Sequence, residues 1–369
     1  MKFDYIIVGA GLTGVVIANK LAENKNNSIL IIEKREHIAG NCYDFKDDSG
    51  IIVHKYGPHC FHTNTEKVWK YLSLFTDWEQ YEHRVLAKVD NNLVPVPFNL
   101  TSIKKCFDNK TSAVLIEKLI SKYGLNTKIA ILDLKKENDI ELKMLSDFVY
   151  KKIFLGYTIK QWGMKPEELS SSVTARIPIF ISEDDRYFQD KYQAIPIAGY
   201  TKMVENMLDK PNITLLLDTN YFEIKEKLVY KKLFFCGMID EFYNYRFGKL
   251  PYRSLRFDFE NYDSNPFQPT TQINYPNEND YTRITEFIHF YKNKNYNKTI
   301  IAKEYPFQYK DELNEIPYYP IPQTKNIELY KKYQNISNND VIFVGRLGNY
   351  TYYNMDQIVE QALKLCEKI

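Results

Sequence analysis

The chain has 369 residues, of which 44% are hydrophobic and 26% charged, and its formal net charge at pH 7 is +2. This length allows two or three domains with cores of their own, and the composition is ordinary for a globular protein. A net charge close to zero, without a long basic block, argues against a protein that binds nucleic acid.

A dinucleotide-binding fingerprint occupies the start of the chain. Residues 3–8 form a hydrophobic run that leads directly into Gly-Ala-Gly-Leu-Thr-Gly at residues 9–14. A second apolar run, residues 29–32, ends in Glu33. A strand, a glycine turn that opens a helix near Leu12, a second strand and an acid together are the context in which a G-x-G-x-x-G motif binds an adenine dinucleotide.

Each part of this fingerprint has a physical role. Gly9 allows the tight turn, Gly11 lets the backbone approach a pyrophosphate, and Gly14 lets the helix pack closely on the strand. The start of the helix directs free N–H groups at the phosphates. Glu33 can accept hydrogen bonds from the ribose hydroxyls, and its charge disfavours a 2′-phosphate, so we do not expect NADP. A turn that serves only helix packing is the alternative.

The next segment favours FAD over NAD. Lys34 and Arg35 are followed by a second small-residue turn, Ala39-Gly40-Asn41, whose N–H groups can also face a pyrophosphate. This arrangement resembles flavoproteins more than it resembles NAD dehydrogenases. The resemblance therefore implies FAD as the cofactor.

Short strands and one helix follow before the composition changes. Residues 51–63 predict a strand that breaks into a loop, and residues 65–75 predict a helix. Residues 84–98 predict two strands joined by a hairpin turn at residues 90–92.

A helical segment interrupts this mixed pattern. Residues 101–162 are rich in Leu, Ile, Lys and Glu and contain only two glycines. Apolar positions recur there at helical spacing; they include Leu142, Leu145, Val149 and Ile153.

The mixed pattern then returns. Residues 165–195 predict a loop and then an extended segment. Within residues 199–239 we expect a helix over 200–208, a strand over 213–217 and an apolar run over 233–238.

The last third of the chain is dominated by strands. Residues 245–305 are rich in Tyr, Phe, Ile and Thr, with a solvated loop expected at residues 292–298. Residues 341–344 predict a buried strand, and a last helix is expected to begin near Met355.

These elements predict an α/β protein. Its parts are a Rossmann-type FAD-binding domain, an inserted helical domain and an antiparallel sheet domain that binds substrate. The expected boundaries are residues 1–80, 196–240 and 335–369 for the discontinuous FAD-binding domain, 99–163 for the helical domain, and 81–98, 164–195 and 241–334 for the sheet domain, with a mobile lid near residues 165–180.

The cysteines and the N-terminus indicate the compartment. The five cysteines are scattered, odd in number and without a C-x-x-C pair, which favours a reducing compartment and argues against a zinc site. Met1 directly precedes the first strand, leaving no room for a signal peptide, and no apolar run is long enough to span a bilayer. We expect a cytoplasmic protein with no membrane insertion and no metal.

Ordered motifs along the chain resemble the UDP-galactopyranose mutase family. They are HKYGPH at residues 54–59 with FHT at 61–63, GYT at 156–158 with KQWG at 160–163, RIP at 176–178, GYT at 199–201, YRFG at 245–248, YRSL at 252–255, YTRI at 281–284, EYP at 304–306, PYYP at 317–320 and GRL at 345–347. So many motifs in one order are more specific than the glycine fingerprint.

The resemblance implies a definite reaction. The family interconverts UDP-galactopyranose and UDP-galactofuranose, which supplies galactofuranose for surface glycans. FAD must be reduced, with NADH or NADPH in solution as the expected reductant. The N5 atom of the reduced FAD then attacks the anomeric carbon and displaces UDP, so that the cofactor is the covalent nucleophile. The sugar ring opens and recloses as the furanose. The resemblance also implies a homodimer whose small-molecule partner is a UDP-sugar.

The same resemblance assigns the substrate residues. Arg176 and Arg283 would clamp the pyrophosphate as catalytic residues, because arginine offers charged, forked donors. His62 would lie beside the flavin as a third catalytic residue. The residues placed at the substrate are Phe154, Tyr157, Trp162, Tyr187, Asn274, Tyr318, Tyr352 and His83. Within this set, Tyr157 would border the uracil with Phe154 beside it, and Trp162 would lie near the uridine.

A further group is assigned to FAD. It comprises Gly9, Gly11, Gly14, Glu33, Lys34, Gly40, Asn41, His59, Cys60, Arg346, Tyr353, Asn354, Met355, Asp356, Gln357 and Ile358. The start of the last helix would offer N–H groups to the flavin edge where negative charge collects on reduction.

Three positions depart from the family's pattern. Asn354 stands where an acidic residue is common, Phe180 where the lid motif has a second arginine, and His83 where an asparagine is often found. These departures leave the identity of the sugar undecided, and UDP-N-acetylgalactosamine is an alternative substrate.

Two other functions share the N-terminal fingerprint. An FAD-dependent oxidoreductase of the amine-oxidase type would turn over with oxygen, but it has no need for the RIP lid or the arginine and tyrosine clamp. A non-catalytic FAD protein would bind the flavin and leave UDP unbound.

Overall fold

The computed structural model describes the chain except for residues 171–176, 265, 292–295, 313–314 and 338–339. It divides into two compact units. The first unit contains Met1–Tyr81, Asp190–Tyr252 and Asp311–Ile369, and the second contains Glu82–Gln189 and Arg253–Lys310.

A parallel sheet of five strands forms the centre of the first unit. Its order is β12 (Ile213–Leu216), β2 (Ile29–Ile32), β1 (Tyr5–Val8), β13 (Lys232–Phe235) and β19 (Val341–Phe343). The sequence of β2, Ile-Leu-Ile-Ile, is fully buried, as expected for a strand covered on both faces.

One strand differs from its prediction. All three residues of β19 are only half-buried, because β19 is the edge strand of the sheet and pairs on one side alone. Val344, which follows β19, is buried as predicted.

Three helices pack in the core of this unit. These are α1 (Leu12–Leu21), α9 (Tyr200–Leu208) and α14 (Met355–Cys366), and α1 contacts both of the others. The remaining elements are η1 (Gly40–Cys42), β3 (Asp44–Lys46), β4 (Ile52–His54), β5 (Phe61–Thr63), α2 (Glu66–Leu72), β6 (Trp78–Gln80), β11 (Tyr192–Pro196), α10 (Tyr221–Ile224), η4 (Lys225–Lys227), α11 (Ile239–Phe242), β18 (Tyr319–Pro320), α12 (Thr324–Asn335) and α13 (Gly345–Gly348).

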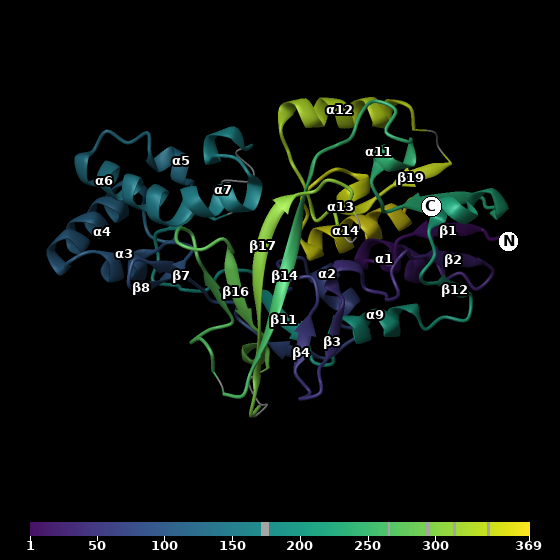
Figure 1. The fold of residues 1–369 in the computed structure, drawn as a ribbon, viewed down its shortest axis with the longest axis horizontal. Coiled ribbons are helices and arrows are strands. Elements are labelled where there is room, and N and C mark those ends of the chain that lie inside the picture. Colours follow the sequence, from purple (N-terminus) through teal and green to yellow (C-terminus); the bar gives the residue numbers. More distant parts are fainter. Residues whose placement is uncertain (171–176, 265, 292–295, 313–314, 338–339) are drawn as a thin grey trace. The chain divides into compact units, whose positions relative to one another are not determined.

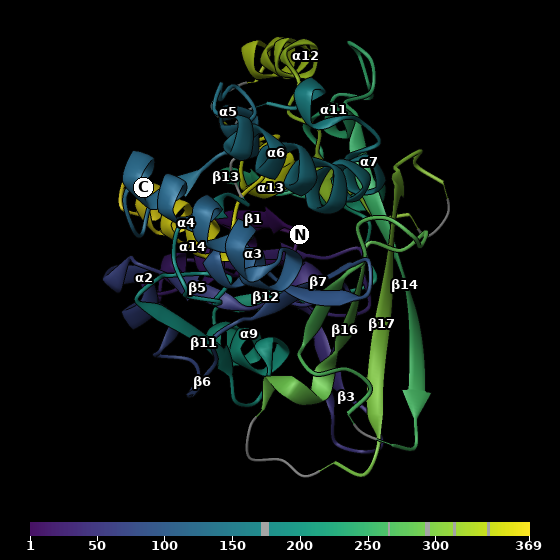
Figure 2. The same cartoon turned by 90° about the vertical axis from the view of Figure 1, so that its left-hand side faces the viewer.

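The second unit contains a mostly antiparallel sheet. Its strands follow the order β14 (Tyr252–Tyr262), β17 (Thr299–Gln308), β16 (Arg283–Glu286), β15 (Gln272–Asn274), β7 (Val85–Val89) and β8 (Asn92–Val96), and only β15 and β7 run parallel. Figure 2 shows β14 and β17 as long neighbouring strands. The predicted hairpin joins β7 to β8 through Asp90, whose φ is +51°.

A group of helices completes the second unit (Figure 1). The elements are α3 (Leu100–Cys106), α4 (Asn109–Tyr123), β9 (Lys128–Ile129), α5 (Ile131–Leu134), α6 (Ile140–Val149), the π-helical turn η2 (Tyr150–Leu155), α7 (Gly156–Trp162), η3 (Pro166–Glu168), β10 (Ile179–Phe180) and η5 (Phe287–Phe290). The predicted apolar positions Leu142, Leu145, Val149 and Ile153 are all buried in one core cluster. The α/β fold class is therefore confirmed.

None of the helices in the described ranges has the length and apolar character needed to cross a bilayer.

Candidate functional site

The glycine fingerprint forms the turn between β1 and α1. Gly9 has a φ of +106°, and its N–H donates to the carbonyl oxygen of Ile32 at 2.8 Å. A Cβ on Gly14 would lie 2.1 Å from the carbonyl oxygen of Gly9. Only glycine at position 14 lets the helix approach the turn this closely, as the spacing predicts.

A second turn lies directly against the first. Ala39 pairs with Gly11 in an isolated parallel bridge, and Gly40 has a φ of +56°. A Cβ on Gly40 would lie 2.8 Å from the Cα of Gly11. The two turns meet through main chain alone, which suits a surface that must come close to phosphate oxygens.

A cavity of about 280 Å³ opens beside these turns, entirely within the first unit. Predicted cofactor residues that line it are Gly9, Gly11, Gly14, Glu33, Lys34, Gly40, Asn41, His59, Arg346, Met355 and Ile358. Predicted cofactor residues outside its lining are Cys60, Tyr353, Asn354, Asp356 and Gln357. The sequence thus brings most of the predicted set to one place.

Glu33 is buried at the end of β2. One carboxylate oxygen, Oε2, accepts the N–H of Ala10 at 2.8 Å, and Oε1 accepts the N–H of Arg35 at 3.0 Å. An ionised carboxylate has about four lone-pair sites, so each oxygen can still accept a hydroxyl proton. The two backbone donors fix the orientation of the carboxylate.

Two arginines on the cavity wall have donors that the described residues leave unused. Arg346 donates from Nη2 to the carbonyl of Tyr353 at 2.9 Å, and Arg35 donates from Nη2 to Oδ1 of Asn41 at 2.9 Å. Yet Nε of Arg346 and Nη1 of Arg35 are buried without a hydrogen-bond partner in the described part of the chain. A buried donor left unpaired costs roughly 1–3 kcal/mol, so an anionic ligand fits this wall.

The cavity also has walls that the sequence did not predict. They are the segments 219–222 and 235–238, together with Glu241, Ile316 and Pro317. The first two segments follow β12 and β13, at the carboxyl ends of parallel strands where ligands of such sheets bind. That rule, applied to the predicted strands, was the signal that could have identified them.

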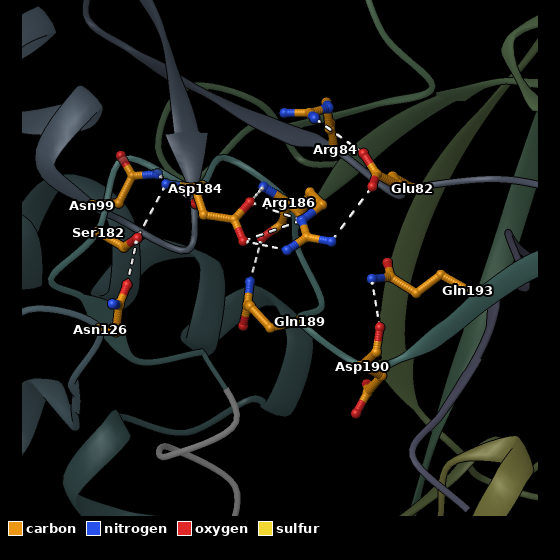
Figure 3. Close-up of polar contacts among 10 residues, drawn as sticks. All are labelled: Glu82, Arg84, Asn99, Asn126, Ser182, Asp184, Arg186, Gln189, Asp190 and Gln193. Carbon is orange, nitrogen blue, oxygen red and sulfur yellow. Dashed lines mark hydrogen bonds and ion pairs between the residues drawn. The ribbon is translucent and has the colours of Figure 1, made fainter. Parts of the chain in front are cut away.

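The segment that carries the HKYGPH and FHT motifs, residues 54–63, contributes one residue to the cavity. His59 lines it, and its N–H donates to Nδ1 of His54 at 3.0 Å. Burial lowers the pKa of His54 to about 3, which keeps that acceptor neutral. His62 lies outside the lining, and its Nδ1 is 2.6 Å from Oδ2 of Asp190. Asp190 is further held through its carbonyl by Gln193 at 3.1 Å (Figure 3).

The two predicted substrate tyrosines of the first unit lie near Arg346. Tyr318 is buried and lines the cavity, and its carbonyl accepts from Nη1 of Arg346 at 3.3 Å. The guanidinium of Arg346 lies 5.3 Å from the ring centroid of Tyr352. Tyr318 therefore contacts through its carbonyl, and Tyr352 through its ring, a guanidinium that belongs to the cavity lining.

In the second unit, Arg283 and Asn274 face each other across β15 and β16. Arg283 donates to Oε2 of Glu304 from Nε at 2.8 Å and from Nη2 at 2.6 Å. The side chain of Glu304 is only 2% exposed, so this ion pair fixes the direction of the guanidinium. Glu304 was not assigned a role from the sequence, because its pairing depends on the register between β16 and β17.

The predicted base-binding residues lie on one helix and the turn before it. Tyr157 and Trp162 belong to α7, where Tyr157 is half-buried and Trp162 buried. Phe154 belongs to the preceding π-helical turn and packs in the hydrophobic core of the unit.

His83 and Tyr187, both predicted to meet the substrate, are neighbours. Their ring centroids are 5.6 Å apart, and the N–H of Tyr187 donates to the carbonyl of His83 at 2.7 Å. The adjacent Arg186 donates to Asp184 through Nε at 2.9 Å and Nη2 at 2.8 Å, as Figure 3 shows. Its Nη1 reaches Glu82 at 3.4 Å. These contacts fix the segment that carries Tyr187.

Two departures from the family's pattern have a local explanation. Phe180 is buried in β10, which pairs with β9, so this position is part of the core. Asn354 precedes α14 as its N-cap, and its N–H donates to Oε1 of Gln357 at 2.9 Å. Asparagine caps helices as well as aspartate does. Arg176 lies outside the described residues, as does part of the predicted lid.

Comparison with known proteins gives consistent results. The model of the UDP-galactopyranose mutase family matches residues 152–352, and that of an NAD(P)-binding Rossmann-like domain matches residues 7–75. The chain is 38% identical to a probable UDP-galactopyranose mutase of Klebsiella pneumoniae, covering 99% of this chain and 94% of that relative.

Two further relatives are similar over nearly their whole length. A dTDP-fucopyranose mutase of Escherichia coli is 35% identical, with 98% of this chain and 97% of the relative covered. A UDP-galactopyranose mutase of Mycoplasma pneumoniae is 33% identical, with 100% and 96% covered. The fold is similar to a crystal structure of a reduced UDP-galactopyranose mutase, with a TM-score of 0.74 at 15% identity over 100% of this chain and 93% of that one.

Proposed function

Because the chain belongs to the UDP-galactopyranose mutase family, we propose that it interconverts UDP-galactopyranose and UDP-galactofuranose. The observation that carries this proposal is similarity over the whole chain to relatives that bear this name. The activity is that of an isomerase, and it would supply galactofuranose for surface glycans.

FAD is the proposed cofactor. The supporting observation is the cavity wall, where the main-chain turns at Gly11 and Gly40 lie beside unused donors of Arg35 and Arg346. These groups would hold the pyrophosphate, and Glu33 would hold the ribose. When bound and reduced, FAD would supply the nucleophile for the anomeric carbon.

The residues of the chain would bind and orient the substrate. Arg283, directed by Glu304, and Arg176 would neutralise the departing pyrophosphate, with hydrogen bonds from Tyr318 and Tyr352. The lid near residues 165–180 would exclude water while the sugar is detached from UDP.

The nucleotide and the sugar are the finer part of the proposal. A relative at 35% identity is a dTDP-fucopyranose mutase, so a different base and a 6-deoxy sugar occur within this similarity range. Asn354 and His83 also replace residues common in the family, which keeps UDP-N-acetylgalactosamine as a second candidate. We place UDP-galactose first because two of the three similar relatives described above bear that name.

A conversion assay tests the proposal. The purified protein is incubated with UDP-galactofuranose, with and without dithionite, and UDP-galactopyranose is measured by chromatography. We expect conversion only with the reduced flavin. Parallel incubations with UDP-N-acetylgalactosamine and dTDP-fucose rank the substrates. If the reduced, FAD-loaded protein converts none of them and instead consumes oxygen with an amine, the oxidoreductase alternative replaces the mutase.

The proposal includes a cytoplasmic homodimer that NADH or NADPH reduces. Size-exclusion chromatography with light scattering tests the dimer. Anaerobic flavin bleaching with each nucleotide tests the reductant.

A further inference from the structure

Lys160 on helix α7 makes an unusual set of contacts. Its ammonium group donates to three backbone carbonyls of one loop, those of Tyr275, Asn279 at 2.8 Å and Tyr281 at 3.2 Å. An ammonium has three donors, so these carbonyls use all of them. Lys160 therefore has no N–H left for a ligand, and its contacts are with the protein alone.

The charge of Lys160 is poorly compensated. No carboxylate within the described ranges forms an ion pair with it, and burial lowers its pKa to about 8. The exposed Asp280 acts in the opposite direction and raises that pKa. Removing a cation from water and holding it only by carbonyl dipoles costs free energy. We therefore expect this contact to have a role in positioning the loop.

The loop that Lys160 holds leads directly to Arg283. Residues 275–282 connect β15 to β16, and the N–H of Tyr275 donates to the carbonyl of Thr282 at 2.8 Å. The loop thus closes on itself immediately before the arginine proposed to meet the pyrophosphate. Any shift of the loop would be transmitted to that guanidinium.

The other end of the loop packs against the start of α7. A Cβ on Gly156 would lie 2.3 Å from the carbonyl oxygen of Pro276. Nδ2 of Asn277 donates to the carbonyl of Lys152 at 2.9 Å, in the turn that precedes the helix. Helix and loop therefore contact each other at both the start and the middle of α7.

A buried cation, Arg253, fixes the end of the same helix. Arg253 on β14 donates to the carbonyls of Lys160 at 2.9 Å and Gln161 at 2.8 Å. These are carbonyls of the last turn of α7, where a positive charge also interacts favourably with the negative end of the helix dipole. With its end tied to the sheet, α7 can keep a defined position relative to the loop.

We propose that Lys160 is a positioning residue for the nucleotide, holding the helix that carries Tyr157 and Trp162 at a set distance from Arg283. This inference rests on the proposed function and on the predicted roles of Tyr157 and Trp162 at the base and of Arg283 at the pyrophosphate. The helix and the loop, held together by Lys160, would then recognise both ends of one nucleotide in a preorganised arrangement.

Three variants test the role of Lys160. Lys160→Gln removes the charge and one donor, and Lys160→Arg keeps the charge and the donors. Lys152→Gln is the matched control, because Lys152 lies in the preceding turn and pairs with the surface residue Asp90 at 2.6 Å. The measurements are the Kd for UDP by calorimetry, KM and kcat for UDP-galactofuranose, and the FAD content of each protein.

We expect Lys160→Gln to raise Kd and KM by about tenfold, because the charged hydrogen bonds to the loop carbonyls are lost. FAD content should stay unchanged, and kcat should stay within about threefold of the wild type. Lys160→Arg should restore Kd to within about threefold of the wild type, and Lys152→Gln should match the wild type. A variant that merely lost folded protein would lower the apparent kcat and leave KM unchanged.

The inference fails if folded, FAD-loaded Lys160→Gln binds UDP like the wild type. Should that variant not fold, hydrogen exchange in the wild type decides. UDP is then expected to slow exchange in residues 156–162 and 275–282 together, and slowing in 156–162 alone contradicts the coupling. A wild-type protein without mutase activity would instead count against the proposed function, which separates the two failures.

Discussion

At the scale of single residues, two glycines offer a matched test of the cofactor cavity. Gly40 and Gly50 both have positive φ, +56° and +77°, so an alanine at either position bears a similar backbone strain. Only at Gly40 would the added Cβ meet another backbone, 2.8 Å from the Cα of Gly11, whereas nothing lies within 4 Å at Gly50.

We therefore expect Gly40→Ala to weaken FAD binding by at least about tenfold, because the two turns must separate. Gly50→Ala should keep the wild-type affinity. Flavin fluorescence titration of the apoprotein measures both. Equal losses in the two variants would mean that backbone strain, and not the contact between turns, governs binding.

Arg283 belongs to the same scale. Its forked contact with the buried Glu304 means that Arg283→Ala would leave an unpaired carboxylate, so Arg283→Lys is the cleaner change. We expect kcat/KM to fall by about a hundredfold or more, because a lysine cannot contact Glu304 through two N–H groups and still present fixed donors to the proposed pyrophosphate.

FAD content should not change in Arg283→Lys, since the residues that line the cofactor cavity all lie in the first unit and Arg283 lies in the second. Arg84→Lys is the control, because Arg84 is an exposed arginine that pairs with Glu82 at 3.2 Å. A variant at Arg283 with wild-type kcat/KM would remove that residue from the clamp.

At the scale of elements, Glu286 organises the end of β16. Its carboxylate is fully buried and accepts hydrogen bonds from the N–H groups of Phe267 at 2.7 Å and Gln268 at 2.9 Å, from Oγ1 of Thr299 at 2.7 Å, and from His289 at 2.8 Å. Burial alone would raise the pKa of Glu286, but these donors outweigh it and lower the pKa below its usual 4.5.

A lowered folded-state pKa has a defined consequence for stability. The contribution of Glu286 is complete above the pKa of the unfolded chain, near 4.5, and is lost as the pH falls through the folded-state pKa below it. We expect Glu286→Gln to lower Tm at neutral pH, and the gap in Tm to the wild type to narrow as the pH decreases below about 4.5. Thermal unfolding of both proteins at several pH values measures this, and a gap independent of pH would contradict it.

At the scale of the whole molecule, the two units should respond differently to the cofactor. A ligand that binds only the folded state stabilises it by about 2.7 kcal/mol at a concentration of a hundred times its Kd. Because the residues that line the cavity all lie in the first unit, FAD should slow hydrogen exchange in β1, β2 and β13.

Exchange in β14 and β17 of the second unit should change much less when FAD is added. Mass spectrometry of peptides from apoprotein and holoprotein measures the difference. Equal protection of both sheets would show that the units unfold together.

Local patterns predicted most of this architecture. The spacing of Gly9, Gly11 and Gly14 and the period of Leu142 and Leu145 each report a conformation that neighbouring residues determine, and the structure confirms them. Similarity to the mutase family, inferred from ordered motifs, is confirmed by full-length relatives.

What the sequence did not predict depends on contacts between distant segments. The half-burial of β19 follows from its place at the sheet edge, and the partner of Arg283 follows from strand register. Lys160 was identified only as part of the KQWG motif, because the carbonyls that it contacts come from a loop more than a hundred residues away in the sequence. The assignments at the substrate, Arg176 among them, stay predictions.

The interleaving of the two units sets an order for synthesis on the ribosome. The second unit is complete in sequence once Lys310 has been translated, whereas the first still lacks β19 and α14. Helix α14 packs on α1, so an element that is translated before the second unit completes its packing only with one that is translated after it. We therefore expect nascent chains to contain a folded second unit while the first unit is unfinished, and deletion of α14 to abolish the proposed FAD binding while sparing the second unit.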